Sequence, residues 1–212
     1  MRGTIVKVCG LTQLVDARAA VEAGADWLGF IVSGESPRRI EVERAAEIVA
    51  ALPGVTAVAV MVDVAPERAL GLATRMGASR VQLHRADAAR WPRDFPLPSA
   101  FAIGVAGDGA LAGALPHEAH LLMLDAAHAT LAGGTGRLVP WDAARRHAAA
   151  RPVLLAGGLS PDNVAAAIEA VRPFGVDASS GLERSPGIKD PERVRRFVAA
   201  VRECDERIRD HA

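Results

Sequence analysis

The stretch Thr56-Ala57-Val58-Ala59-Val60-Met61-Val62 is apolar at every position after the first. A strand that is apolar on both faces is typical of a parallel sheet whose two sides are both covered. A helical pattern follows over Pro66–Met76, and a strand followed by a helix is the repeating unit of α/β proteins. This part of the sequence therefore predicts a parallel sheet with helices packed on it.

The same alternation runs along the whole chain. Strands are predicted at Thr4–Val8, Trp27–Val32, Thr56–Val62, Arg80–Leu83, Phe101–Val105, His120–Leu124, Pro152–Ala156 and Gly175–Ala178. Helices are predicted at Leu14–Ala23, Val42–Ala51, Pro66–Met76, Ala86–Trp91, Asp142–Ala149, Pro161–Val171 and Pro191–Ile208. Thr12 is expected to cap the first helix, and the glycine-rich run Gly104–Gly113 is the weakest helical stretch.

Eight strands that alternate with helices, without a break in composition, predict one domain over residues 1–212. The expected fold is α/β, a single-domain (β/α)8 TIM barrel that is compact for its class. An open doubly wound sheet is the alternative, because periodicity does not report closure of a sheet.

The composition is ordinary for a soluble globular protein. The chain has 25 Lys and Arg and 25 Asp and Glu residues, and this balance gives no electrostatic case for binding nucleic acid or an anionic membrane. No apolar run reaches the roughly 20 residues that cross a bilayer, and two cysteines provide neither a disulfide framework nor a metal-binding spacing. We expect a cytoplasmic protein with no metal and no cofactor. Lys7 and Lys189 are the chain's lysines, and Lys189 is expected in an exposed loop.

Two side chains at strand ends are candidates for acid–base chemistry. Cys9 ends the first strand, and Lys7 shares its face because side chains alternate along a strand. A nearby ammonium favours the thiolate, the form of cysteine that acts as base or nucleophile; the alternative is a small buried apolar residue. Asp125 ends the sixth strand after four apolar residues, where desolvation would raise its pKa and suit it to be a general acid. A turn or cap aspartate is the alternative.

Glycine-rich loops after two neighbouring strands predict a phosphate site. Gly157 and Gly158 follow the seventh strand, and Ser179-Ser180-Gly181 follows the eighth. Backbone N–H groups in such turns bind phosphate, and barrels often use these two loops for it. The long loop Ala126–Pro140, which contains Gly134, is expected to fold over a substrate, with a plain connector as the alternative.

Three more polar residues stand near strand ends. Arg38 follows the second strand and is a candidate for a two-pronged contact with a substrate carboxylate, or else a solvated charge. His84 ends the fourth strand, where a histidine of the rim or core is the alternative. Asp177 lies inside the eighth strand and is expected to hold neighbouring loops in place.

Taken together, these motifs resemble the phosphoribosylanthranilate isomerase family of the tryptophan pathway. The matching segments run in order through nearly the whole chain: Lys7–Gly10, Ala23–Asp26, Gly29-Phe30, Ser36–Arg38, Val81–His84, Leu124-Asp125, Gly133–Trp141, Ala156–Leu159, Asn163-Val164, Gly175–Glu183 and Pro186–Asp190. The run Ala102–Val105 departs from the pattern because it lacks the family's usual lysine, and the loop before Trp141 also differs.

The resemblance implies a barrel that catalyses a cofactor-free Amadori rearrangement of N-(5-phosphoribosyl)anthranilate to 1-(2-carboxyphenylamino)-1-deoxyribulose 5-phosphate. It implies that Asp125 is the general acid that opens the ring and that Cys9 is the general base at the sugar C2. The implied substrate-binding residues are Lys7, Arg38, His84, Gly134, Gly157, Gly158, Asp177, Ser179, Ser180 and Gly181. The implied partner is a small molecule, with the chain as a monomer or a homodimer.

Two other functions stay open from the sequence. One is a related phosphosugar barrel, either an isomerase of histidine biosynthesis, which has an aspartate where Cys9 stands, or a pentose-phosphate epimerase with a metal held by residues such as His84 and Asp125. The other is a degenerate barrel that binds a phosphosugar without catalysis, which the changes in the fifth strand and the long loop would suit.

Overall fold

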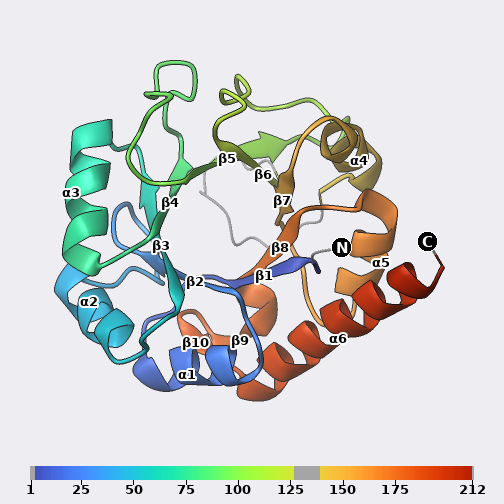
Figure 1. The fold of residues 1–212 in the computed structure, drawn as a ribbon, viewed down its shortest axis with the longest axis horizontal. Coiled ribbons are helices and arrows are strands. Elements are labelled where there is room, and N and C mark those ends of the chain that lie inside the picture. The colour runs from blue at the N-terminus through green and yellow to red at the C-terminus, as the bar shows by residue number, and fades with distance from the viewer. Residues whose placement is uncertain (1–2, 127–138, 212) are drawn as a thin grey trace.

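The computed structural model describes residues 3–126 and 139–211. Its strands are β1 (Ile5–Val8), β2 (Trp27–Ile31), β3 (Thr56–Val62), β4 (Arg80–His84), β5 (Ser99–Val105), β6 (Leu121–Ala126), β7 (Val153–Leu155) and β8 (Gly175–Ala178). Each strand pairs in parallel with the next, and β8 pairs with β1 to close the ring, as Figure 1 shows. The predicted closed barrel is therefore confirmed.

Helices surround most of the ring (Figure 1). They are α1 (Leu14–Glu22), α2 (Val42–Ala50), α3 (Pro66–Met76), α4 (Trp141–Ala150), α5 (Val164–Val171) and α6 (Pro191–Asp210). The strand-to-strand connections from β4 to β5 and from β5 to β6 lie within the described residues and contain no helix. The barrel thus has loops in two places where the (β/α)8 plan has helices.

The helix predicted at Ala86–Trp91 is wrong, and the structure gives the reason. The Asp87 carboxylate accepts a hydrogen bond from the Ala89 N–H, a local turn that competes with helical hydrogen bonding. Trp91 packs its ring against Phe95 and Phe101, with centroids 5.0 and 5.5 Å away. A loop anchored by an aromatic cluster therefore covers this side of the barrel.

One predicted helix cap and one predicted helix start are also wrong, although α1 begins at Leu14 as predicted. Gln13 takes the cap position of α1, while the Thr12 hydroxyl donates to the Gly187 carbonyl at 2.6 Å. The helix predicted from Pro161 begins at Val164, because the Asn163 side chain accepts from the Ser160 N–H and closes a turn first. Thr12 therefore joins two distant segments of the chain, and Asn163 closes the turn that precedes α5.

The barrel wall separates two hydrophobic cores. The outer core lies between strands and helices and takes Val6 and Val8 from β1. The inner core contains Ile5, Cys9, Trp27, Val58, Val60, Met123, Leu154 and Ala156. Lys7 Nζ and Cys9 Sγ both lie next to Gly29. The prediction that these two side chains share a face is therefore confirmed.

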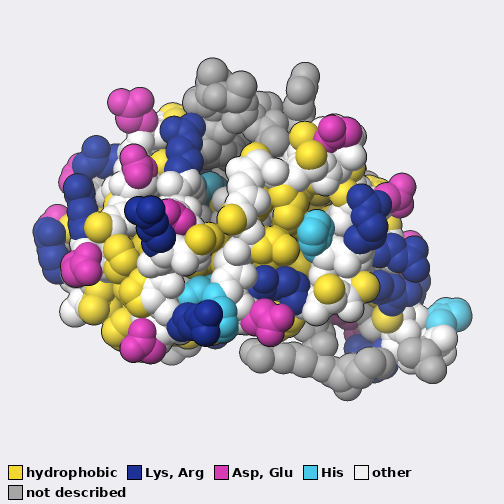
Figure 2. Space-filling view, turned by 90° about the horizontal axis from the view of Figure 1, so that it is seen from above, with side chains coloured by type: hydrophobic (Ala, Val, Ile, Leu, Met, Phe, Trp, Pro, Cys, Tyr) yellow, Lys and Arg dark blue, Asp and Glu magenta, His cyan; other side chains and the backbone are white. Residues whose placement is uncertain are grey.

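A short 3-10 helix, η1 (Ser180–Leu182), and a hairpin of β9 (Glu183–Ser185) and β10 (Ile188–Lys189) lie between β8 and α6. Lys189, expected in an exposed loop, is fully buried here. The reason is an ion pair with Glu183, whose carboxylate lies 2.7 Å from the lysine nitrogen. The surface view in Figure 2 shows charges of both signs dispersed among hydrophobic side chains. In the described part of the chain, no helix is both long and apolar enough to span a bilayer.

Two glycine-to-alanine changes test how tightly the barrel closes. A Cβ atom at Gly175 in β8 would lie 2.8 Å from Ile5 Cβ, whereas one at Gly71 in α3 would meet nothing within 4 Å. We expect Gly175→Ala to lower the free energy of unfolding by about 1–3 kcal/mol through overpacking. Gly71→Ala should raise it by about 0.5–1 kcal/mol, because alanine loses less backbone entropy. Urea unfolding measures both, and equal stability of the two variants would contradict this account of closure.

Candidate active site

A cavity of about 280 Å³ opens at the barrel mouth, where the strands reach their C-terminal ends. Its lining residues come from β1, β2, β3, β4, β6 and β8 and from the loops that follow them: Cys9, Ile31, Glu35, Ser36, Pro37, Arg38, Val60, Gln82, His84, Met123, Asp125, Asp177 and Ser179. Six of the residues predicted from sequence are among them. Barrels place active sites at this end because loops from many strands meet there.

A buried ion pair lies beneath Cys9. The Lys7 ammonium donates to the Asp177 carboxylate at 2.6 Å and is fully buried. Burial alone would lower the pKa of Lys7, but Asp177 and Cys9 together hold it above its ordinary value. Lys7 does not line the cavity, whereas the two residues that its ammonium contacts, Cys9 and Asp177, both do.

The Cys9 thiol responds to two opposing effects. Burial raises its pKa, and this outweighs the lowering produced by the Lys7 ammonium, which hydrogen-bonds to the thiol. The sequence argument that the ammonium favours the thiolate is correct in sign, but burial is the larger effect. The net direction therefore favours the protonated thiol.

Two glycines make this close packing possible. A Cβ atom on Gly29 would lie 2.9 Å from Cys9 Sγ and 3.0 Å from Lys7 Nζ. Gly10 has a φ of 72°, and a Cβ atom there would lie 2.7 Å from Arg38 Cδ. The left-handed backbone of Gly10 and its missing side chain therefore let Arg38 lie close to the end of the first strand.

His84 is held neutral by its surroundings. Burial, and then the charges of Lys7 and Arg85, lower its pKa to about 4. The Gln82 side-chain nitrogen lies 2.9 Å from His84 Nε2, so a neutral ring that accepts this hydrogen bond carries its proton on Nδ1. Gln82 was not among the residues predicted from sequence, although a polar residue two positions before His84 lies on the same strand face and is a usable signal.

The Gln82 side-chain oxygen is buried and has no hydrogen-bond partner among the described residues. An unpaired buried amide oxygen costs free energy, and Gln82 lines the cavity. Gln82 is therefore a candidate acceptor for a hydroxyl group of a bound molecule.

A second, smaller cavity of about 40 Å³ lies between the loops after β7 and β8. Gly157, Gly158, Ser179 and Ser180 line it, and Asp125, Asp177 and Ser179 line both cavities. Gly157 and Gly158 have φ values of 81° and 65°, which glycine adopts with the least strain. This is the place where the sequence predicts a phosphate.

The other two predicted glycines are placed differently. Gly181 packs against the neighbouring loop, because a Cβ atom there would lie 2.2 Å from the Leu159 carbonyl oxygen. Its lack of a side chain lets the two loops touch. Gly134 lies outside the described residues.

Arg38 reaches the cavity from the loop after β2 and meets a carboxylate of the protein itself. Its Nε lies 2.9 Å from Glu183 Oε1, and its Nη2 lies 2.8 Å from Glu183 Oε2. Sequence reasoning missed Glu183 and assigned Lys189 to the surface. The signals were present: Glu183 ends a matching motif, and Lys189 is one of the chain's two lysines.

Within the described residues, no group of three or more His, Cys, Asp and Glu side chains is placed to hold a metal ion. Asp125 is buried, with 9% of its surface exposed, at the border of the two cavities. The mouth of the barrel therefore combines a thiol, a carboxylate, a guanidinium and two glycine-rich loops.

A family model for N-(5'-phosphoribosyl)anthranilate (PRA) isomerase matches residues 6–200. The chain belongs to the phosphoribosylanthranilate isomerase family. The phosphoribosylanthranilate isomerase of Rubrobacter xylanophilus is 45% identical over 202 residues, which cover 93% of this chain and 98% of the relative. The one of Desulforudis audaxviator is 42% identical, with 95% and 99% covered. The family predicted from sequence is confirmed.

Solved structures of the phosphoribosylanthranilate isomerase family agree. The crystal structure from Thermotoga maritima has a TM-score of 0.81 at 33% identity and covers 94% of this chain and 99% of its own. Another isomerase structure, in complex with reduced 1-(o-carboxyphenylamino)-1-deoxyribulose 5-phosphate, has a TM-score of 0.78 at 31% identity, with the same coverage.

The depressed pKa of His84 predicts a pH dependence of stability. Since the folded-state pKa is about 4 against an ordinary 6.5, the unfolded chain binds the proton more readily between these values. The contribution of the neutral His84 to the free energy of unfolding is therefore complete above pH 6.5, and it is lost as the pH falls towards 4. In urea unfolding, His84→Gln should flatten this loss, whereas the control His147→Gln, on α4, should keep the wild-type slope. Parallel profiles for wild type and His84→Gln would contradict the assignment.

Proposed function

We propose that this chain converts N-(5-phosphoribosyl)anthranilate to 1-(2-carboxyphenylamino)-1-deoxyribulose 5-phosphate by a cofactor-free Amadori rearrangement in tryptophan biosynthesis. The observation that carries the proposal is that Cys9 and Asp125, from β1 and β6, line one cavity that borders the glycine-rich loops. The family relationship supports the same reaction, because a relative binds a reduced form of this product.

The two anionic ends of the substrate fit two parts of the site. The phosphate would occupy the smaller cavity between Gly157-Gly158 and Ser179-Ser180, where backbone N–H groups are available. The anthranilate carboxylate would meet the guanidinium of Arg38. Held at both ends, the sugar lies between Cys9 and Asp125, and this positioning supplies a large part of the rate enhancement.

The chemistry needs one proton donor and one proton acceptor. Asp125, in its protonated form, would donate to the furanose ring oxygen, so that the C1–O bond breaks and an iminium ion forms. Cys9, as thiolate, would then remove the proton from C2, and the resulting enolamine would tautomerise to the ketone. The iminium places a positive charge near the thiol, which lowers its pKa at the step that needs the thiolate.

Lys7 would serve as a positioning residue for the base. Its ammonium hydrogen-bonds to the Cys9 thiol and is held in place by Asp177. A fixed ammonium beside the sulfur stabilises the thiolate without contacting the substrate. The neutral His84 and the unpaired oxygen of Gln82 would contribute hydrogen bonds to the ribose hydroxyls.

We further propose that residues 1–212 act as one domain in the cytoplasm, as a monomer or a homodimer. A solved relative from Thermotoga maritima is described as dimeric, and monomers have been generated from it.

Three substitutions test the assignment of acid and base. Cys9→Ser and Asp125→Asn should each lower kcat by about 10²–10⁴-fold, the usual contribution of a general acid or base. Cys204→Ser, which alters a buried thiol on α6, should keep nearly wild-type activity. The assay generates phosphoribosylanthranilate in situ and follows the loss of anthranilate fluorescence with the next pathway enzyme present. An inactive but folded wild-type chain would refute the proposed reaction, and wild-type rates in either site variant would refute that residue's role.

A further inference from the structure

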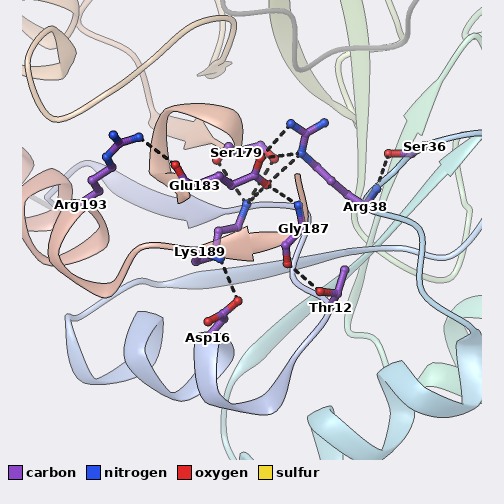
Figure 3. A network of polar contacts seen from close by, with 9 residues as sticks. All are labelled: Thr12, Asp16, Ser36, Arg38, Ser179, Glu183, Gly187, Lys189 and Arg193. Atoms are coloured by element: carbon purple, nitrogen blue, oxygen red, sulfur yellow. Dashed lines mark hydrogen bonds and ion pairs between the residues drawn. The ribbon is translucent and has the colours of Figure 1, made fainter. Parts of the chain in front are cut away.

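The carboxylate of Glu183 is shared by the partly buried Arg38 and the buried Lys189 at the edge of the cavity (Figure 3). Arg38 donates to it from Nε and Nη2, and Lys189 donates from Nζ at 2.7 Å. The Gly187 N–H adds a fourth donor group at 3.3 Å. One carboxylate thus holds together the loop after β2 and the hairpin after β8.

All three charged side chains are well shielded from water. The exposed fractions are 13% for Arg38, 4% for Glu183 and 0% for Lys189. Burial alone would raise the pKa of Glu183, but the hydrogen bonds from Arg38 and Lys189 hold it below its ordinary value. The carboxylate is therefore ionised. Burial lowers the pKa of Lys189, which its ion pair with Glu183 opposes.

Lys189 also reaches the loop that lines the smaller cavity. Its Nζ lies 3.2 Å from the Ser179 carbonyl oxygen and 3.4 Å from the Ser179 hydroxyl. Its backbone N–H donates to the Asp16 carboxylate of α1 at 2.9 Å. In Figure 3 the lysine side chain points from the hairpin towards Ser179 and Glu183. Lys189 therefore connects the loop after β8 to the carboxylate that holds Arg38.

The hairpin that carries these residues is fastened from several sides. Arg193 of α6 donates to the Glu183 carbonyl at 2.8 Å, and Thr12 donates to the Gly187 carbonyl at 2.6 Å. Buried charges linked to a fixed backbone keep one geometry, because any displacement leaves a charge without its partner. The positions of Arg38 and Ser179 are therefore set by the same rigid unit.

The contacts of Arg38 leave part of its guanidinium available. Glu183 takes the Nε–Nη2 edge, and Nη1 makes no hydrogen bond to any described residue. Arg38 lines the cavity. The remaining N–H edge of its guanidinium, held in a fixed orientation by Glu183, can therefore donate hydrogen bonds to a second carboxylate in the cavity. Orienting the arginine in advance reduces the ordering cost of binding and sharpens the preference for a planar carboxylate.

We infer that Glu183 and Lys189 are positioning residues that hold Arg38 and Ser179 at a set separation, so that the site selects phosphoribosylamines whose aryl ring bears a carboxylate. This inference rests on the proposed function. Glu183 acts on the carboxylate end through Arg38, and Lys189 acts on the phosphate end through Ser179. Neither side chain needs to touch the substrate.

The test compares two substrates in steady-state kinetics: N-(5-phosphoribosyl)anthranilate and the same compound without the carboxylate, made from aniline. Glu183→Gln should lower kcat/KM for the anthranilate compound on the order of 10-fold or more, with little change for the aniline compound. The matched control Glu192→Gln removes an exposed carboxylate on α6 and should leave the preference unchanged. If Glu183→Gln lowers kcat/KM equally for both compounds, its role is merely structural and the inference is overturned.

Lys189→Met tests the phosphate end. It should raise KM for both compounds by a similar factor, because both carry the phosphate; a change confined to the anthranilate compound would overturn its assigned role. If Glu183→Gln does not fold, the double variant Glu183→Gln/Lys189→Met removes a carboxylate and a counter-ion together, and it should lose the same preference. A double variant with wild-type preference overturns the inference alone, whereas a wild-type chain that converts neither compound overturns the proposed function and the inference with it.

Discussion

The buried ion pair between Lys7 and Asp177 is the interaction on which both the fold and the site depend. The two residues lie opposite each other in the register of β1 and β8, so the pair joins the first and last strands where the ring closes. The same ammonium hydrogen-bonds to Cys9. Removing either partner would leave an unpaired charge inside the barrel, which costs far more than the pair contributes when intact. One ion pair therefore spans the seam where the barrel closes and also fixes the ammonium beside the thiol.

Around this pair, three glycines allow close packing because they have no side chain. Gly29 gives room to Lys7 and Cys9, Gly10 lets Arg38 approach the first strand, and Gly181 lets the loops after β7 and β8 touch. A methyl group at any of these positions would fall within 3.0 Å of a neighbouring atom, a distance that packed carbon atoms do not tolerate. The glycines thus let segments that are far apart in the sequence pack against one another at the barrel mouth.

Patterns within single segments were enough to predict the strands, their parallel order and the strand-end positions of Cys9 and Asp125. Features that depend on distant partners were not predictable in this way. Trp91 packs on the ring of Phe101 in β5, and Lys189 is buried because Glu183 pairs with it. The balance between burial and ammonium at Cys9 likewise follows from the closed barrel and has no signature in the local sequence.

The cost of buried charge indicates what the cluster of Arg38, Glu183 and Lys189 is for. Apolar side chains of similar volume often stabilise a fold as well as a buried ion pair does, or better, so stability alone does not account for three charged groups at this position. What charges provide is direction: each hydrogen bond fixes an angle as well as a distance. A substrate with an anion at each end needs two binding groups at a set separation. A carboxylate shared by two cations, on a hairpin anchored to α1 and α6, meets that need at the expense of stability.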